Sequence, residues 1–543
     1  MLSSLLLHIT TFLTSIGLGE WFGVESSVSG PTIARGSTLQ ASPSPQVLLL
    51  SNEIDSWMAQ AYVFKEEVDY SLGLSVSDLK TAPKNSKEEV DYSLGLSVSD
   101  LKTAPKNSKE EVDYSLGLIY IPDENHQQSS LQELSRSLDS LAGCFTLFPL
   151  YSEVETGPIK NPGDRAGKWG DYRNCDSPKW LLQHMLQHIV ANHPDIDYVL
   201  CTGDLVPHHI WKISRQDNVA VMRQMTNILK GFFPNIPIYA AIGNHESFPR
   251  DSFPPPEVPE VWEKFGIQWL YDTIADQWEK LVKGPAPSSI RFGGYYSVLI
   301  RPGLRLISIN TNYCYRFNWW LLYKSVDPGL VLRWLVSELH DAEKRGELVH
   351  IIGHVPPYYT DCYSQWAHQF SRIVTRYSHI IRGQFYGHSH MDEFRLHYDV
   401  NSPQKPIGVQ YITPNNGPFN NLNPSFRLFY IDGDYPETTR KVLDYETWVM
   451  NLTHANKFDA PHWYQLYSAR RDLQLPTLDP YDWDQLVQRM AQDPELFSKY
   501  RRYQVQDSDM YAKRSCGEKC RRKVLCTIVD GDKLMPPKCH PHD

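Results

Sequence analysis

Short apolar runs alternate with longer amphipathic stretches along the chain from residue 165 onward. Buried strands are short, about four to eight residues, whereas a helix needs about ten or more residues with its apolar side chains on one face. The apolar runs predict strands at 198–201, 236–242, 304–309, 349–352, 383–386, 409–412 and 428–431. Amphipathic stretches predict helices at 178–192, 219–232 and 328–345. Because strands and helices interleave, we expect a layered α/β domain over residues 165–450.

A polar motif that opens with glycine follows four of the predicted strands. The motifs are Gly203-Asp204, Gly243-Asn244-His245-Glu246, Gly353-His354 and Gly387-His388-Ser389-His390. In an open α/β sheet the loops beyond the carboxyl ends of the strands converge on one crevice. A carboxylate, an amide oxygen and several imidazoles suit zinc or a similar divalent ion. A single Gly-Asp is usually only a turn, so it is the ordered set of four that predicts a metal site.

These motifs resemble those of the calcineurin-like metallophosphoesterases, and most closely those of the acid sphingomyelinase family. The segments that carry the resemblance are TGDLVPHHIW, AIGNHESFPRDSFPPPE, LRLISINTNYC, HIIGHVPP, QFYGHSHMDEF and CGEKCRRKVLC. It runs from about Ala166 to Cys539. It implies a layered metallophosphoesterase sandwich of β-sheets flanked by helices over residues 165–459, followed by a helical, disulfide-bonded subdomain over residues 460–543.

The resemblance also implies a site for two zinc ions. Asp204 would bridge the ions, Asn244, His354 and His388 would complete one of them, and His390 would bind the other. If the two imidazoles of Gly387-His388-Ser389-His390 point to opposite sides, each could serve one of two neighbouring ions. Such a metal pair lowers the pKa of a shared water and offsets charge on phosphoryl oxygens. The implied reaction is the hydrolysis of sphingomyelin to ceramide and phosphocholine, at a membrane or lipoprotein surface.

Further residues are assigned by the same resemblance. His208 and His245 match the histidines beside the scissile phosphate, and His208 is our choice for the general acid. Glu246 is expected to orient His245 or a metal ligand. A choline head group is attracted to aromatic faces by cation–π interaction. The aromatic candidates near the motifs are Tyr313, Tyr315, Trp319, Trp320 and Phe419.

The chain lacks the first motif of the family, an Asp-x-His after the first strand, which supplies two ligands to one ion. The nearest candidates are Asp123 with His126, which has one residue too many, and Asn52 with Ile54. Either an exon has been lost from the underlying gene sequence, or the protein is a one-metal or inactive relative. We therefore expect this chain to hydrolyse sphingomyelin weakly or not at all. The alternatives are a nucleotide phosphodiesterase and a catalytically silent protein that binds lipid or metal.

The cysteines predict disulfides in the carboxyl-terminal region. Four cysteines crowd into the last 28 residues, and their spacing lacks the Cys-x2-Cys pairs that usually deliver two ligands to one zinc ion. Two disulfides are thus favoured over a structural zinc site. By resemblance, the pairs are Cys314 with Cys362, Cys516 with Cys520, and Cys526 with Cys539. Cys201 is interpreted as a free thiol, and Cys144 could pair with Cys175.

The amino-terminal residues 1–19 are apolar and end in small residues, which is typical of a signal peptide. They lack the Lys or Arg that usually comes before the apolar run of such a peptide. Asn451-Leu452-Thr453 is an acceptor for N-glycosylation if the chain is secreted. We expect a secreted or lysosomal protein.

With 53 basic and 63 acidic residues, the chain has no global attraction to nucleic acid. No uncharged apolar run after residue 20 is long enough to span a membrane. The oligomeric state is left open.

Residues 20–164 contain an identical repeat of 22 residues, at 65–86 and again at 87–108. Natural solenoid repeats diverge and need about three or more full copies. We interpret the segment as an inserted stretch without chemistry of its own. A six-cysteine saposin-like module, which precedes the catalytic domain in the resembling family, is absent, because Cys144 is the only cysteine before residue 165.

Overall fold

The computed structural model describes residues 166–539, except for 174, 209–212, 257, 259–264, 283–286, 359, 513 and 536. The described residues fall within one compact unit. Several predictions concern residues outside the described ones: the signal peptide at 1–19, the repeats, Cys144, and the two weak candidates for the first motif at Asp123 and Asn52.

A six-stranded sheet forms the centre of this unit. Its strands, in spatial order, are β3 (Tyr296–Arg301), β4 (Leu304–Ser308), β5 (Leu348–Ile352), β6 (Ile381–Tyr386), β8 (Ser402–Ile412) and β7 (Glu393–Asp399). The four inner strands are parallel, and β3 and β7 are antiparallel edges. Successive side chains point to opposite faces, so Ile351 joins one hydrophobic core and Ile352 the other. The predicted continuous apolar runs therefore correspond to strands covered on both faces.

Two smaller sheets complete the β-structure. β1 (Val199–Cys201) and β2 (Ile238–Ala240) form a parallel pair. β9 (Ser425–Ile431), β10 (Val442–Met450) and β11 (Trp463–Ser468) form an antiparallel sheet in the order β11-β10-β9. The ring of Phe385 on β6 meets that of Phe429 on β9 edge to face, 4.9 Å apart between centroids. Sheet therefore packs on sheet, as the predicted sandwich requires.

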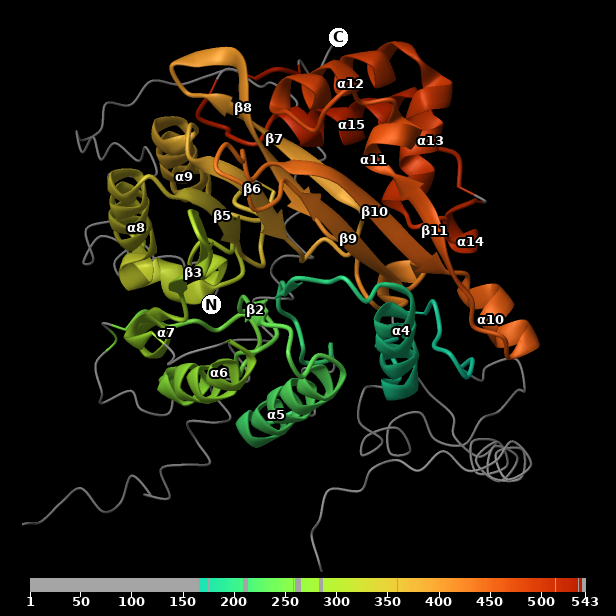
Figure 1. Cartoon of the computed structure of the whole chain (residues 1–543), viewed down its shortest axis with the longest axis horizontal. Helices are drawn as coiled ribbons and strands as arrows, with labels where there is room; N and C mark the ends of the chain where they lie inside the picture. Colours follow the sequence, from blue (N-terminus) through green and yellow to red (C-terminus); the bar gives the residue numbers. More distant parts are fainter. Residues whose placement is uncertain are drawn as a thin grey trace, which may run out of the picture. The chain divides into compact units, whose positions relative to one another are not determined.

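Helices cover both sides of the sheets (Figure 1). On one side, α8 (Val331–Arg345) and α9 (Ser364–Tyr377) contribute to the core that also contains residues of α4 (Lys179–Asn192), α5 (Arg215–Phe232) and α6 (Gln268–Leu281). On the other, α12 (Pro480–Gln492), α13 (Pro494–Gln504) and α15 (Glu518–Val529) contribute to the second core. Shorter helices are α7 (Ser288–Gly293), α10 (Leu452–Phe458), α11 (Ala469–Leu473) and α14 (Asp509–Ala512).

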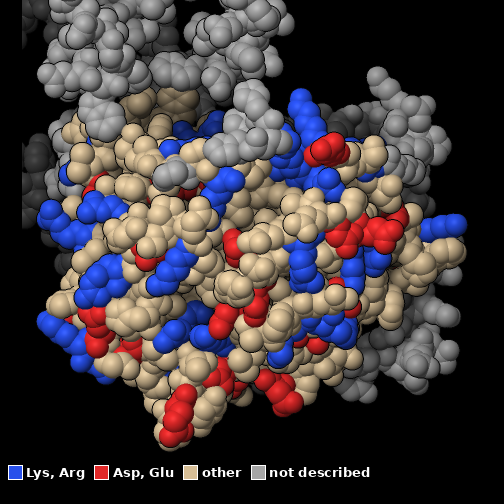
Figure 2. Space-filling view, turned by 90° about the horizontal axis from the view of Figure 1, so that it is seen from above, with Lys and Arg blue, Asp and Glu red and all other residues tan. Residues whose placement is uncertain are grey.

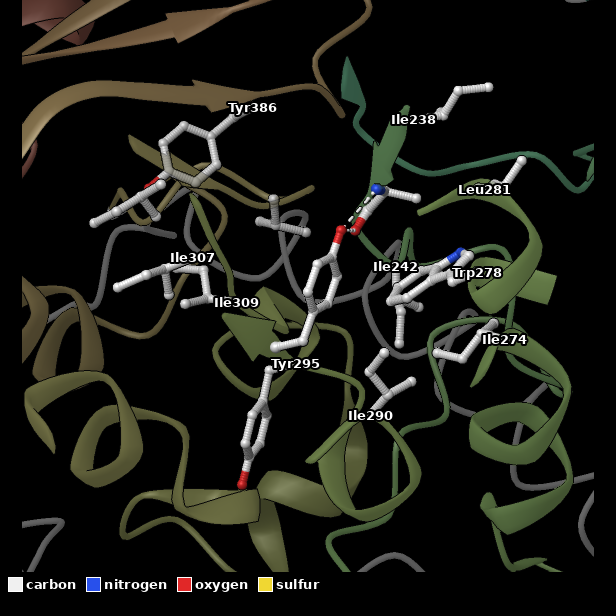
Figure 3. Close-up of a cluster of buried hydrophobic side chains, with 14 of the residues drawn as sticks. Ile238, Ile242, Ile274, Trp278, Leu281, Ile290, Tyr295, Ile307, Ile309 and Tyr386 are labelled. Carbon is white, nitrogen blue, oxygen red and sulfur yellow. Dashed lines mark hydrogen bonds between the residues drawn. The ribbon is translucent and has the colours of Figure 1, made fainter. Parts of the chain in front are cut away.

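The first core is dominated by branched and aromatic side chains. Figure 3 shows Ile274, Trp278 and Leu281 of α6 beside Ile238 and Ile242 of the β2 segment. The three α6 residues lie three or four positions apart, so they share one face of the helix. A tyrosine hydroxyl ties this layer to the main sheet: Tyr296 on β3 donates to the main-chain oxygen of Ala240, and the Ala240 N–H donates to the hydroxyl.

All seven predicted strands and three predicted helices are present, with bounds that differ by a few residues. β8 is longer than expected, and β3, β7, β10 and β11 were not predicted. β7 reads Glu-Phe-Arg-Leu-His-Tyr-Asp and carries buried Arg395 and His397, so its composition hides a covered strand. The sheet also continues past the expected boundary at residue 459, because β11 pairs with β10. The helical region begins only after β11.

The three predicted disulfides among the described cysteines are confirmed. Cys314 bonds to Cys362, and the carboxyl-terminal pairs are Cys516–Cys520 and Cys526–Cys539. Cys201 is a free thiol, as predicted. Cys175 is buried and disulfide-bonded. A disulfide typically stabilises a fold by about 2–4 kcal/mol. Cys516–Cys520 ties the segment before α15 to the start of that helix, and Cys526–Cys539 ties the segment after it to the helix.

Charged side chains of both signs are interspersed on the face of the molecule in Figure 2. Within the described part of the chain, no helix is both long and apolar enough to cross a bilayer.

Candidate metal centre

The four glycine-led motifs follow the carboxyl ends of β1, β2, β5 and β6. Two glycines let the β1 and β2 ends approach each other. A Cβ on Gly203, whose φ is +95°, would lie 2.4 Å from the main-chain nitrogen of Gly243. A Cβ on Gly243 would lie 2.1 Å from Oδ1 of Asp204. A side chain at Gly203 would therefore push the two strand ends apart, and one at Gly243 would displace the Asp204 carboxylate.

Four predicted ligands meet at one point, and we call Asp204, Asn244, His354 and His388 the cage. Nε2 of His354 lies 3.0 Å from Oδ2 of Asp204 and 2.9 Å from Oδ1 of Asn244. Nδ1 of His388 lies 3.0 Å from the same Asn244 oxygen and 3.3 Å from Nε2 of His354. Ligand atoms about 2.0–2.1 Å from a tetrahedral zinc ion are about 3.3 Å from one another, so these separations are close to those of a zinc site.

Hydrogen bonds to neighbouring residues orient the lone pairs of the His354 and Asn244 ligand atoms toward the centre of the cage. Nδ1 of His354 donates to the main-chain oxygen of Thr202 at 2.7 Å, which leaves Nε2 of that ring as an acceptor. The amide nitrogen of Asn244 donates to Oδ1 of Asp251 at 2.7 Å, which turns the Asn244 oxygen toward His354 and His388. When the His354 ring is neutral, these acceptor atoms face one another, and a bound cation would stabilise that arrangement. The residues therefore fit a divalent ion with nitrogen and oxygen ligands.

Buried charge around the cage is balanced locally. Burial alone would raise the pKa of Asp204, but the charges of His354 and His245 hold it well below its usual range. Burial and the nearby Asp204 charge raise the pKa of Glu246 to about 7. The Glu246 carboxyl accepts the main-chain N–H groups of Asp204 and Leu205, at 3.2 and 2.5 Å. Glu246 thus positions a cage residue, which is one of its two predicted roles.

Backbone conformation adds to the special character of the site. Asp204, His388 and His390 all have positive φ, at 57°, 70° and 65°. Residues other than glycine adopt this region rarely, and such strain is concentrated at functional sites. The left-handed turns on both sides of Ser389 set the two histidines of that motif in different directions, which an extended segment alone would not explain.

His390 lies apart from the cage. Its Nδ1 accepts from the Asn420 side-chain amide at 3.2 Å, and its main-chain oxygen accepts from Nε2 of Gln506 at 2.7 Å. Among the described residues, Asp204, His354 and His388 are the one group of three acidic, cysteine or histidine side chains with ligand atoms mutually within 4.8 Å. A second ion would find only Asp204 and His390 of the predicted ligands.

A histidine–aspartate pair lies beside the cage. Asp176 accepts from Nδ1 of His208 at 2.6 Å and from its main-chain N–H at 2.9 Å. Burial alone would raise the pKa of Asp176, but the His208 hydrogen bond and charge lower it. The His208 ring stacks on Phe419 at 3.6 Å and lies 4.3 Å from the ring of His245. His245 donates its main-chain N–H to Oδ1 of Asp204 at 3.0 Å. Both predicted catalytic histidines are thus next to the cage.

The aromatic candidates for a choline subsite are not equivalent. Phe419 lies against His208, and the ring of Tyr315 meets that of His388 edge to face at 4.9 Å. Tyr313 is fully buried, and its hydroxyl bonds to Tyr271 and to the main-chain oxygen of Pro254. The assignment of Tyr313 to substrate binding is therefore corrected, because its ring belongs to the core. Trp320 is buried and Trp319 partly exposed.

Sequence analysis missed three residues that organise this site: Asp176, Asp251 and Gln506. Asp176 precedes α4, and nothing in its Cys-Asp-Ser-Pro context indicates a partner 32 positions later. Asp251 is seven residues after the Asn244 that it holds, within a proline-rich loop. Gln506 lies far from the motifs in sequence. Of the three, only Asp251 could have been found from the sequence, because it is an acidic residue close to the predicted ligand Asn244.

The sheets thus gather aspartate, asparagine and histidine at their strand ends, which is a ligand set for a divalent metal ion. Comparison with known families agrees: a model of the calcineurin-like phosphoesterases matches residues 172–392, and one of the acid sphingomyelin phosphodiesterase carboxyl-terminal region matches residues 405–542. The chain belongs to the acid sphingomyelinase family of these phosphoesterases.

Individual relatives support this placement. The chain is 41% identical to a sphingomyelin phosphodiesterase of Bos taurus over 392 residues, which cover 72% of this chain and 61% of that protein. It is 35% identical to sphingomyelin phosphodiesterase 2 of Caenorhabditis elegans, and the match covers 75% of this chain and 67% of that protein. It is 30% identical to acid sphingomyelinase-like phosphodiesterase 3b of Homo sapiens, and the match covers 68% of this chain and 81% of that protein. The match thus spans about three fifths of the length of the bovine protein.

Proposed function

We propose that this protein is a zinc-dependent phosphodiesterase that hydrolyses sphingomyelin to ceramide and phosphocholine. The observation that carries the proposal is the cage, whose four inward-facing ligand atoms lie about 3 Å apart with the His208–Asp176 pair beside it. The similarity to proteins named sphingomyelin phosphodiesterase supports the choice of substrate.

The bound ion would offset negative charge on the phosphoryl oxygens and lower the pKa of a water at the site. His208 then protonates the departing ceramide oxygen through Nε2, because its Nδ1 is occupied by Asp176. Asp176 fixes the orientation of the ring. Burial lowers the pKa of His245 to about 4. That ring is neutral near neutral pH, which argues against His245 as the proton donor.

The number of ions distinguishes this proposal from its alternatives. The cage supplies four ligands to one ion, whereas the second position has only Asp204 and His390. We expect about one tightly bound zinc per chain and slow turnover of sphingomyelin. A chain that binds zinc and hydrolyses no phosphodiester would instead be a silent relative.

The test is to purify the full chain, measure its zinc by elemental analysis, and assay one preparation with sphingomyelin in detergent micelles and with ATP. Phosphocholine release that is abolished by chelation and restored by zinc supports the proposal. The same preparation with His354→Ala is the control for contaminating hydrolase. Cleavage of ATP without release of phosphocholine would favour the nucleotide phosphodiesterase. The absence of activity on both substrates would favour the catalytically silent relative.

The same proposal includes export of the protein to the cell exterior or the lysosome. Stable disulfides form in oxidising compartments, and those after residue 300 include one that joins two active-site loops, Cys314–Cys362. Asn451 is the proposed glycosylation site. Its Oδ1 caps helix α10 by accepting from the His454 N–H at 2.8 Å, so an attached glycan would have to leave this bond in place.

A further inference from the structure

Basic side chains are concentrated at helix α15 and the segment before it. Residues 514–529 include five basic residues and one acidic residue, Glu518, whereas the whole chain carries a net charge of −10. The four basic residues that we call the basic face are Arg514, Lys519, Arg522 and Lys523. Three of them are exposed and Arg522 is partly exposed. A local surplus of positive charge on an acidic protein marks an electrostatic interaction surface.

The fold holds the four charges of the basic face together. Arg522 and Lys523 follow Lys519 by three and four positions, so the three side chains lie on one side of the helix. The Cys516–Cys520 disulfide holds the preceding segment against the first turn, with the two Cα atoms 5.2 Å apart. Arg514 therefore lies at the same end of the helix.

The opposite side of α15 anchors the helix to the domain. Leu525 and Ile528 are buried in the second core. The Cys526–Cys539 disulfide ties the last turns of the helix to the segment that follows. Because both the apolar side and the two ends of the helix are held, the basic face stays directed to solvent.

The positive charges of the basic face are not compensated by described carboxylates. Within the described part of the chain, none of its four side chains forms an ion pair. Asp530, just after the helix, accepts the main-chain N–H groups of Lys538 and Cys539 at 2.6 and 3.3 Å. Asp532 pairs with His368 at 2.8 Å. Glu518 alone offsets only one of the five positive charges, so the surface attracts a partner with several negative charges.

We propose that the basic face binds a sulfated polysaccharide. Short clusters of Lys and Arg are typical of heparin-binding surfaces. Among described residues 511–533, no large apolar side chain is exposed, so the face lacks the groups that insert at a bilayer interface. The nearest aromatic ring, that of Tyr511, is only partly exposed and lies 5.0 Å from the Arg514 guanidinium, which leaves little surface for stacking on bases. The choice of a polysaccharide over a nucleic acid also rests on the export proposed above.

The test measures the affinity of the full chain for fluorescein-labelled heparin by fluorescence anisotropy at several salt concentrations. The basic-face variant is Arg514→Gln with Lys519→Gln and Lys523→Gln, three changes at exposed positions. We expect this variant to bind heparin at least about tenfold more weakly than the parent. The slope of log affinity against log salt should be less steep by about three, because each lost contact releases about one counterion fewer.

The matched control is Arg223→Gln with Lys344→Gln and Lys405→Gln, which removes the same residue types from exposed positions on α5, α8 and β8. It should bind heparin as the parent does. Equal weakening in both variants would overturn the proposal, because net charge and not this face would then decide the affinity. No binding by the parent, or binding that survives desulfation of heparin, would also overturn it. So would tighter binding to duplex DNA or to vesicles that contain phosphatidylserine.

A second readout separates the basic face from the proposed function. Zinc content and phosphocholine release should be equal in the basic-face variant and the parent, because the changed residues belong neither to the cage nor to the His208–Asp176 pair. Heparin binding that depends on the basic face, without any release of phosphocholine, would support this surface and reject the proposed function. Release of phosphocholine without heparin binding would do the reverse.

Discussion

At the scale of single residues, the pairing of His208 with Asp176 decides how well the proposed general acid works. The 2.6 Å bond orients the ring so that Nε2 faces away from Asp176. We expect Asp176→Asn to lower kcat on a soluble phosphodiester by about 10- to 100-fold, and His208→Gln by about 10²- to 10⁴-fold. Zinc content, measured beside the rates, should be unchanged in both variants. A loss of zinc in either one would assign the pair to metal binding and not to proton transfer.

A second prediction at this scale concerns Gly243. A methyl group there would lie 2.1 Å from Oδ1 and 2.2 Å from the main-chain nitrogen of Asp204. Gly243→Ala should therefore weaken zinc binding by at least about tenfold, as disturbed support of metal ligands commonly does. Gly231→Ala is the control, since no atom lies within 4 Å of its added Cβ on the exposed side of α5. That control should raise stability by about 0.5–1 kcal/mol. Competition with a chromophoric chelator measures the affinity.

At the scale of elements, a buried ion pair joins the loop after His390 to the three-stranded sheet. Arg427 on β9 pairs with Asp392, which also accepts from the hydroxyls of Thr447 and Tyr467 at 2.7 Å each. The guanidinium lies 4.1 Å from the centre of the Tyr445 ring. Strands β9, β10 and β11 thus converge on one carboxylate, two residues beyond a predicted ligand. The sheet that was largely unpredicted is therefore part of the support of the site.

Removing one member of this pair should be costly, because the other charge stays buried. We expect Arg427→Leu to lower the free energy of unfolding by about 3–5 kcal/mol in urea titrations. Arg471→Leu is the matched control. It breaks an exposed pair with Asp472 and should cost about 1 kcal/mol or less. Equal effects of the two substitutions would contradict the supporting role of the buried pair.

At the scale of the whole molecule, buried histidines couple stability to pH. Burial lowers the pKa values of His350 and His397 to about 4, against about 6.5 in an unfolded chain. Between these values the unfolded state binds more protons than the folded state, so stability falls as the pH falls from 6.5 toward 4. Above pH 6.5 both rings are neutral in both states, and their full contribution is present.

We expect each of these two histidines to account for a loss of up to about 3 kcal/mol by pH 4. Urea titrations of the parent at pH 7, 5.5 and 4.5 measure the total slope. His397→Gln removes one of the two titrating groups and should make the slope shallower. A parent whose stability is constant from pH 7 to 4.5 would contradict this prediction.

The local composition of the chain was enough to predict the inner strands and the chemistry of the cage. The segments of β4, β5 and β6 are short, rich in apolar residues and followed by a glycine or polar motif. Strands that are covered on both faces have this composition. Gly-Asp, Gly-Asn-His, Gly-His and Gly-His-Ser-His identified the cage residues, since ligand type and strand-end position are both local properties.

Tertiary structure alone decided which of these groups meet and which do not. His208 finds Asp176 across 32 residues, Tyr313 turns into the core, and left-handed turns separate His388 from His390. β7 was hidden because its polar residues, Arg395 and His397, are buried by partners from other elements. Periodicity records the average surroundings of a segment, whereas these contacts depend on close packing between segments that are distant in sequence.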